Sequence, residues 1–190
     1  MNNNFFASLT NELILVDQAK ADPEAFAAIY DIYFARIYNY ARYRVLDPLT
    51  ADDLTSEIFE KVLVKLHTYQ SERGPFSAWL FTISRNTVNY HLRKQKIRQW
   101  VSLENFRNQA SREPKPDEQF TKDETQRELL GVISRLSEQE RELIALKFNG
   151  GLTNRTISEI TGLKENNVAV ILHRVIKRIR AQLEVNEVLK

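Results

Sequence analysis

The feature that most constrains the fold is the spacing of apolar residues, which recur three and four positions apart along most of the chain. This spacing places side chains on one face of an α-helix. No segment alternates apolar and polar residues as a half-buried strand does, and the apolar run 168–171 lies inside a longer helical period. The sequence therefore predicts an all-α fold.

Three helices are expected in the first hundred residues. Pro23 suits the first position of one helix, and Pro48 ends it because a proline disfavours the helical conformation of the residue before it. Thr50 is the expected N-cap of the next helix. The expected spans are 23–45, 51–67 and 76–96, with inward-facing stripes of Phe26, Ile29, Tyr30, Tyr33, Ile37 and Tyr40, then Leu54, Ile58, Val62 and Leu66, then Phe76, Trp79, Leu80, Ile83 and Thr87.

The helical period fails in the middle of the chain. Between residues 102 and 124, two prolines, several amides and mixed charges give no regular spacing. At 190 residues the chain is long enough for two small cores. We therefore expect two small helical domains, 1–101 and 125–190, joined by a flexible linker over 102–124.

The second domain carries a strong local signal. Ser137 and Glu140 match a capping box, and Thr153 is the expected cap of a short helix that ends at Gly162. A longer helix follows from about residue 165, so the pattern predicts a helix-turn-helix whose second helix can enter a DNA major groove. An ordinary helical hairpin with a glycine turn fits the same residues.

Composition excludes several classes of function. The chain has no cysteine, so disulfides, thiol nucleophiles and cysteine-based zinc sites are ruled out. Its three histidines lie far apart, and no glycine-rich phosphate loop or set of catalytic residues occurs. We expect no cofactor, no metal and no enzymatic activity. The N-terminus lacks signal-peptide features and no apolar run approaches a membrane span, so we expect a cytoplasmic protein without membrane insertion.

Charge is unevenly distributed although the net charge is only +2. Residues 1–70 carry 6 basic and 10 acidic residues, residues 71–100 carry 6 and 1, and residues 151–190 carry 7 and 4. Two basic blocks suggest two contacts with a polyanion, and the acidic block suggests a separate docking surface. Solvated helix faces are the alternative.

The expected helix over 76–96 carries amides, an aromatic ring and arginines on one face. Amides read base edges, rings stack on exposed bases and arginines hold phosphates, so this combination suits unpaired DNA. Trp79 and Trp100 are expected to be core residues. The residues predicted to contact unpaired DNA are Asn86, Asn89, Tyr90, Arg93 and Lys94.

Four segments in order resemble a bacterial RNA polymerase sigma factor of the extracytoplasmic-function (ECF) group. They are Asp52–Phe59, Phe76–Asn86, Leu136–Glu142 and the helix-turn-helix at 152–163. The resemblance covers roughly residues 20–183. It implies a factor without catalytic activity that binds core RNA polymerase and directs promoter-specific initiation at −10 and −35 elements. A stand-alone helix-turn-helix regulator is the alternative.

The resemblance also implies roles for individual parts. The first domain would dock on the polymerase clamp and melt the −10 element, with Asn86 on the non-template strand and the loop 68–75 around a flipped base. The linker would thread toward the RNA exit channel. Promoter DNA and an anti-sigma factor are the other expected partners. The residues expected to face the clamp are Asp52, Asp53, Leu54 and Glu57.

The expected recognition helix departs from the family. Ala169, Val170 and Ile171 stand where polar or basic residues are common, and Lys164 stands where a serine-like cap is common. We therefore expect weak −35 reading, with apolar contacts to thymine methyl groups. The residues predicted to contact the −35 element are Lys147, Arg155, Lys164, Asn166, Asn167, Ala169, Val170, His173, Arg174 and Lys177.

Overall fold

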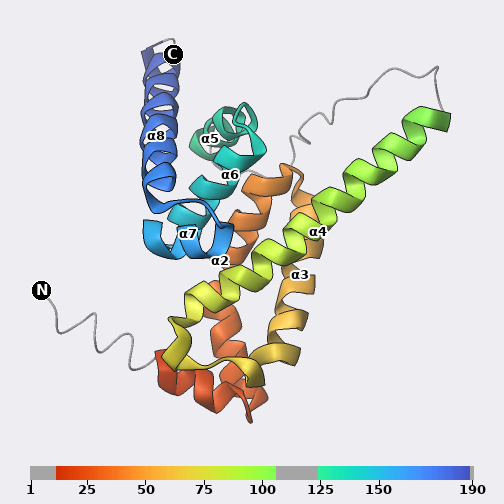
Figure 1. Ribbon diagram of the computed structural model, residues 1–190, viewed down its shortest axis with the longest axis vertical. Coiled ribbons are helices and arrows are strands. Elements are labelled where there is room, and N and C mark those ends of the chain that lie inside the picture. Colours follow the sequence, from red (N-terminus) through yellow and green to blue (C-terminus); the bar gives the residue numbers. More distant parts are fainter. Residues whose placement is uncertain (1–11, 106–123, 189–190) are drawn as a thin grey trace, which may run out of the picture.

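The computed structural model describes residues 12–105 and 124–188 (Figure 1). Every element in these two ranges is helical, which confirms the predicted all-α fold. We call residues 12–105 the first unit and residues 124–188 the second unit. After a helical segment at 12–19, the first unit contains α2 (Pro23–Val45), α3 (Pro48–Lys65), the short 3-10 turns η1 (Leu66–Thr68) and η2 (Ser71–Arg73), and α4 (Phe76–Asn105).

Aromatic rings fill much of the core of the first unit. Tyr40 and Phe81 meet edge to face with ring centroids 5.5 Å apart, and Tyr33 and Phe76 do the same at 5.6 Å. Such edge-to-face pairs stabilise beyond the area they bury. All four rings are essentially inaccessible. They join α2 to α4. Through these contacts α2 supports α4 and the side chains that α4 presents to solvent.

The turn between α2 and α3 differs from the expectation. Leu46 adopts a left-handed conformation with φ of 65°, and Asp47 is extended before Pro48. The extended backbone that proline requires of its predecessor is also the backbone of an N-cap. Asp47 therefore caps α3 and accepts a hydrogen bond from the Thr50 amide at 2.7 Å. The prediction of Thr50 as the cap was wrong by three residues.

The helix ends of the second unit follow the sequence closely. Both bonds of the capping box between Ser137 and Glu140 form, Thr153 caps α7, and Gly162 ends α7 with φ of 77°. Gly151, with φ of 61°, lets the chain leave the preceding helical turn. The unit contains α5 (Glu124–Ser134), α6 (Glu138–Ile144), the π-helical turn η3 (Ala145–Asn149), α7 (Asn154–Thr161) and α8 (Glu165–Val188).

Two expected core positions are exposed. Tyr30 retains 38% of its surface, because it lies at the edge of the α2 stripe, where its ring contacts Phe59 and the exposed Phe34. Trp100 retains 75%, because α4 continues past residue 96 and its last turns extend beyond α2 and α3 (Figure 1). Residues 102–105 of the expected linker are therefore the end of α4, and residues 106–123 lie outside the described residues.

The two units pack against each other. Helix α2 lies along α6 and η3, and α4 meets α7. The helix-turn-helix formed by α7 and α8 is thus held beside the helices of the first unit. This packing determines which of the predicted DNA-contacting residues are accessible.

Candidate nucleic-acid interface

Helix α4 presents the residues predicted to meet unpaired DNA along one side. Asn86 and Lys94 are exposed, and Tyr90 retains 58% of its surface. Arg93 is also exposed, although its Nε donates to the backbone oxygen of Asn89 at 3.3 Å. Asn89 itself is half-buried. The structure therefore places four of these side chains at the surface and the fifth at the border with the second unit.

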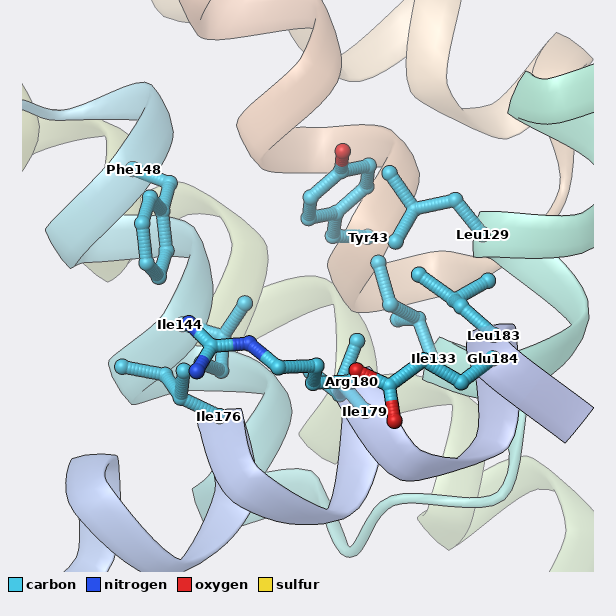
Figure 2. A pocket seen from close by; sticks show the side chains of 10 residues that line it. All are labelled: Tyr43, Leu129, Ile133, Ile144, Phe148, Ile176, Ile179, Arg180, Leu183 and Glu184. Carbon is cyan, nitrogen blue, oxygen red and sulfur yellow. The ribbon is translucent and has the colours of Figure 1, made fainter.

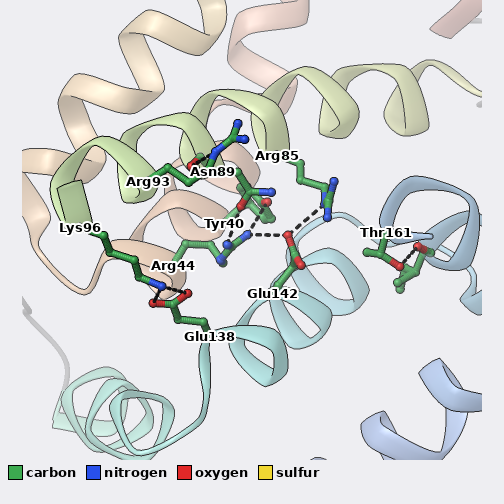
Figure 3. A network of polar contacts seen from close by, with 10 residues as sticks. Tyr40, Arg44, Arg85, Asn89, Arg93, Lys96, Glu138, Glu142 and Thr161 are labelled. Carbon is green, nitrogen blue, oxygen red and sulfur yellow. Dashed lines mark hydrogen bonds and ion pairs between the residues drawn. The ribbon is translucent and has the colours of Figure 1, made fainter. Parts of the chain in front are cut away.

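Asn89 belongs to a polar network between the units (Figure 3). The Glu142 carboxylate on α6 accepts from Arg44 Nη1 at 2.9 Å and from Arg85 Nε at 3.0 Å. Arg44 also donates to Asn89 Oδ1 at 2.8 Å and to the Tyr40 hydroxyl at 3.1 Å. We call these five residues the inter-unit polar network. It couples α2 and α4 of the first unit to α6 of the second through one carboxylate.

The network is shielded from solvent. The side chain of Arg44 is 4% exposed and that of Glu142 is 13% exposed. Burial raises the pKa of Tyr40 to about 12, with the Glu142 charge acting in the same direction and Arg44 opposing it. Removing one partner of such a buried ion pair leaves an uncompensated charge, which is far more costly than losing a surface pair.

Two further ties join the units. Lys96 Nζ lies 2.8 Å from the Glu138 carboxylate, in a pair that is about half exposed on both sides. Arg36 of α2 donates to the backbone oxygens of Asn149 and Gly150, at 3.0 and 2.6 Å. These oxygens lie at the end of η3, where a helical turn leaves its last carbonyl groups without partners of its own. The guanidinium of Arg36 supplies donors to them.

A cleft of about 630 Å³ lies between α4 and the second unit, next to this network. Asn86, Asn89 and Arg93 line one wall, while Glu138 and Glu142 line the other. Both carboxylates are paired with basic side chains, Glu138 with Lys96 and Glu142 with Arg44 and Arg85. The face of α4 predicted to contact DNA therefore lies beside ion pairs with the second unit.

The predicted recognition helix α8 is open by contrast. Asn166, Asn167, His173, Arg174 and Lys177 are exposed, and Val170 retains 57% of its surface, whereas Ala169 is half-buried. Of the remaining predicted −35 residues, Lys147 donates to Asn154 Oδ1 at 3.1 Å, Arg155 pairs with Glu159 at 3.3 Å, and Lys164 is exposed.

The acidic face of α3 needs one correction. Asp52 and Asp53 are exposed, and Glu57 is half-exposed with Lys61 Nζ at 2.6 Å. Leu54 is only 2% exposed, because it belongs to the apolar stripe that packs α3 on α2. Its side chain is therefore part of the core and is not exposed beside the three carboxylates predicted to face the clamp.

The loop 68–75 is braced by the tyrosine that begins it. Tyr69 is 4% exposed, meets Phe76 edge to face, and donates through its hydroxyl to the Gly74 oxygen at 3.1 Å. Gly74 has φ of 142°, which side chains rarely permit. The polar side chains between them, Gln70 to Arg73, are exposed. The loop expected to surround a base is thus a short, closed turn with a polar rim.

An apolar pocket of about 510 Å³ lies on the other side of the second unit (Figure 2). Most of its wall comes from α5, η3 and α8, and Tyr43 of α2 closes one side. Phe148, at its edge, retains 60% of its surface. Its lining residues are Tyr43, Leu129, Ile133, Ile144, Phe148, Ile176, Ile179, Arg180, Leu183 and Glu184.

Among the described residues, no group of three histidine or acidic side chains is arranged to hold a metal ion. Within the same ranges, no helix is both long and apolar enough to cross a bilayer. The described residues present two polar helix faces on α4 and α8, an acidic face on α3 and an apolar pocket in the second unit.

Comparison with known families decides what this arrangement belongs to. Residues 29–98 match sigma-70 region 2, and residues 126–179 match sigma-70 region 4. The ECF RNA polymerase sigma factor BldN of Streptomyces coelicolor is 31% identical over 166 residues, covering 87% of this chain. The chain belongs to the ECF sigma factors. It spans 63% of the length of BldN.

Other ECF sigma factors show the same relation. SigX of Bacillus subtilis is 27% identical over 165 residues, covering 85% of this chain and 84% of that protein. The solved structure of RpoE in complex with the anti-sigma factor NepR from Bartonella quintana matches with a TM-score of 0.67 at 22% identity, covering 84% of this chain and 97% of that one. CnrH in complex with the cytosolic domain of CnrY matches with a TM-score of 0.61 at 21% identity, over 90% and 96% of the two chains. These structures share the fold.

Within this sigma factor, the structure brings together residues that sequence reasoning kept apart or missed. Arg36, Arg44 and Glu142 were not singled out, although they make the contacts between the region 2 and region 4 units. A signal for Arg44 exists, because it lies four positions after buried Tyr40 on a predicted core face. Glu142 carries no such signal, since its partners are 57 and 98 residues away.

Proposed function

We propose that this chain binds core RNA polymerase and directs promoter-specific transcription initiation through a −10 and a −35 element. The observation that carries the proposal is the pairing, in one ECF sigma factor, of two exposed polar helix faces on α4 and α8 with a separate acidic face on α3. Two DNA-facing helices fit two promoter elements, and an acidic face fits a protein partner of opposite charge.

The proposed division of labour follows the two units. The domain at 1–101 docks on the clamp and opens the −10 element, and the domain at 125–190 reads the −35 element as duplex. The residues between them tether the second contact to the first, which makes it intramolecular. On α4, Asn86 contacts the non-template strand, and Asn89, Tyr90, Arg93 and Lys94 extend that surface.

For α8, the supporting features are exposed polar and basic side chains around an apolar centre. Val170 offers a thymine methyl contact, while Asn166, Asn167 and Arg174 supply hydrogen bonds. The basic residues contribute phosphate contacts that carry no sequence information. Sequence choice at the −35 element is therefore modest in this proposal.

For the clamp, the supporting feature is the exposed carboxylates of α3. Asp52 and Asp53 face solvent and Glu57 is half-exposed, so they present negative charge on one helix. Electrostatic complementarity steers association and fixes the register of a complex. Buried Leu54 acts only by holding α3 in place.

The packing of the two units implies a conformational step. Arg85 and Asn89 of α4 are engaged by Glu142 and Arg44, and the cleft beside Asn86 contains both carboxylates of the second unit. A DNA strand that enters this cleft competes with Glu138 and Glu142 for the same basic side chains, so its binding displaces these contacts. In this proposal the region 4 unit moves away from α4 when the factor engages polymerase and promoter.

An anti-sigma factor is the proposed regulatory partner. The similar structures of RpoE with NepR and of CnrH with CnrY contain such partners. The pocket edged by Phe148 has the apolar lining that an amphipathic helix fills. Because Tyr43 closes the pocket from the region 2 side, a helix bound there contacts both units.

The proposal assigns the chain no catalytic activity, no cofactor and no membrane insertion, and places it in the cytoplasm, where core polymerase transcribes. The rival proposal is a stand-alone regulator that uses only α7 and α8. The two differ in one measurable property, which is binding to core polymerase.

Run-off transcription with purified core polymerase and a library of promoters tests the proposal. Specific transcripts that require the chain are expected. The double variant Asp53→Arg/Glu57→Arg should remain helical and lose retention on core polymerase, because a charge reversal opposes the docking face. Transcription that is indifferent to the chain, with DNA binding retained, would support the stand-alone regulator instead.

A further inference from the structure

The cleft between α4 and the second unit carries more positive than negative charge. Its charged lining residues are four basic and two acidic side chains, which leaves an excess of two positive charges. Figure 3 shows these side chains together around the inter-unit polar network. The basic members are Arg44, Arg85, Arg93 and Lys96, and the acidic members are Glu138 and Glu142.

The ion pairs within the cleft do not remove this excess. Arg44 and Arg85 share the single carboxylate of Glu142, while Lys96 pairs with the other carboxylate. Within the described residues, Arg93 pairs with no carboxylate, and its Nε donates to a backbone oxygen instead. A guanidinium carries five N–H donors, so Arg93 retains donors for a further acceptor.

Arg44 is the most buried of these cations. Its side chain is 4% exposed, and its Nε makes no hydrogen bond within the part of the chain that the structure describes. Buried polar atoms are usually hydrogen-bonded, and a buried charge is costly unless it is fully compensated. An additional anion in the cleft would compensate the charge of Arg44, since Glu142 is shared with Arg85.

The size and lining of the cleft fit a small molecule. Its volume of about 630 Å³ lies within the range of ligand pockets, which is about 300–1,000 Å³. Asn86, Asn89 and Gln139 add amide groups that both donate and accept hydrogen bonds. Helix α4 forms one wall and α6 another, with Thr161 and Leu163 beside them. A ligand in the cleft therefore contacts both units.

We propose that this cleft binds a small phosphorylated anion of the pyrophosphate class, either free or as part of a nucleotide, and that the bound anion holds the two units together. Guanidinium groups match phosphate oxygens with paired hydrogen bonds, which suits Arg85 and Arg93 on one wall. A ligand that contacts both walls has higher affinity for the packed form and shifts the equilibrium toward it. The anion thereby opposes the separation of the units, and only this consequence for promoter binding rests on the proposed function.

Calorimetric titration of the full-length chain with sodium pyrophosphate tests the site. Saturable binding of one anion per chain is expected. Gln139→Glu adds a third carboxylate to the cleft without removing an ion pair, and it should weaken binding about tenfold. Gln139 is exposed near the start of α6, where a negative charge favours the helix, so the fold should be unchanged.

Gln95→Glu provides the matched control. Gln95 is exposed on α4 and is not among the residues that line the cleft. The same added charge should therefore change pyrophosphate binding by less than about twofold, since separated surface charges are screened by salt. A parallel titration with a nucleoside diphosphate distinguishes the two sources of the anion. Tighter binding than pyrophosphate assigns the cleft amides to the nucleoside, and equal binding means that the phosphates alone are recognised.

Hydrogen exchange separates an anion that bridges the units from one that binds α4 alone. With pyrophosphate bound, the amides of α6 should exchange more slowly, because the packed form is favoured. Unchanged exchange in α6 would contradict bridging. Equal weakening by Gln139→Glu and Gln95→Glu would show that the anion binds the basic helix outside the cleft, and a lack of saturable binding would remove the site. None of these measurements uses polymerase or promoter, so their failure is distinguishable from failure of the proposed function.

Discussion

Helices α4 and α8 are both proposed to meet DNA, yet their surroundings differ. The middle of α4 lies beside carboxylates of the other unit, and Arg85 already shares Glu142 with Arg44. The outward side chains of α8, from Asn166 to Lys177, face solvent instead. The proposed DNA-contacting face of α4 is therefore partly occupied within the protein, while that of α8 is open.

The difference follows from where each helix finds its counter-charges. Helix α4 has no acidic residue before Glu104, so its basic side chains can be neutralised only from outside the helix. Helix α8 begins with Glu165, and its Arg178 pairs with Glu140 inside the same unit. Arg85 and Lys96 of α4 therefore pair with Glu142 and Glu138 of the second unit. These pairs add to the contacts that Arg36 and Arg44 of α2 make with the same unit.

The substitution with the largest expected effect removes Glu142, the carboxylate of the second unit that accepts from Arg85 of α4. Glu142→Ala should weaken the packing between the units by about 3–5 kcal/mol, because it leaves the buried Arg44 charge without its partner. Small-angle scattering should report a larger radius of gyration, and amides of α6 should exchange faster. Glu138→Ala is the control, since its half-exposed pair with Lys96 contributes at most about 1 kcal/mol. Equal expansion in both variants would contradict the central role of Glu142.

The next largest expected effect concerns the proposed contact of α4 with the −10 element, after the region 4 unit has moved away. Asn86→Ala should weaken promoter opening by about 1–3 kcal/mol, the cost of losing a buried amide contact, and spare binding to a −35 duplex. Permanganate footprinting at subsaturating holoenzyme measures the opening. Unchanged melting would remove Asn86 from the −10 surface and leave α4 without a base-reading residue at that position.

On the open helix α8, single substitutions should act mainly through phosphates. Arg174→Ala in the full-length chain should lower the magnitude of the log–log salt slope for a −35 duplex by about 0.9, the value for one phosphate contact. Discrimination between matched and scrambled duplexes should change little. Arg135→Ala removes the same charge from an exposed position after α5 and should leave the slope unchanged. A thousandfold discrimination by the unaltered chain would refute weak −35 reading.

The smallest effect lies inside the region 4 unit. Burial alone would raise the pKa of Glu140, but hydrogen bonds from the Ser137 amide and from Arg178 hold it below its usual value. A lowered carboxyl pKa stabilises the fold above the unfolded-state pKa, and the contribution disappears as pH falls through the folded-state value.

Glu140→Gln keeps an acceptor for the Ser137 amide and loses the charge. It should therefore cost up to about 1 kcal/mol at neutral pH, given a partly exposed partner, and nothing in acid. Denaturant unfolding at both pH values measures this. A difference that persists in acid would mean that the amide substitution disturbs packing rather than charge.

Local sequence patterns predicted most elements because helix faces and caps are local properties. Leu54, Ile58, Val62 and Leu66 form the expected buried stripe of α3, and the caps at Ser137 and Thr153 occur as expected. The same stripe conflicts with assigning Leu54 to a docking face. Leu54 lies three positions after buried Ala51 and four before buried Ile58, so it shares their face and is buried with them.

The parts that could not be predicted depend on contacts between distant segments. Arg36 meets Asn149 and Gly150 across more than a hundred residues, and no spacing rule links such positions. The prediction for Trp100 was wrong for a different reason. Its large apolar ring favours a core position by composition alone, but α4 carries it beyond the helices that would cover it. Accessibility on α4 is thus a property of the assembled units.

A ligand in the apolar pocket closed by Tyr43 would shift the equilibrium between packed and separated units. The pocket wall is complete only while the two units are together, so a ligand that fills it has higher affinity for the packed form than for the separated one. By mass action, a ligand that bound the packed form alone and was present at a hundred times its dissociation constant would stabilise that form by about 2.7 kcal/mol, and any binding to the separated form reduces this value. Linkage is reciprocal, so if promoter DNA separates the units as proposed, it must weaken the binding of that ligand by the same factor. Competition between ligand and promoter then requires no shared residue, because each one selects a different arrangement of the same two units.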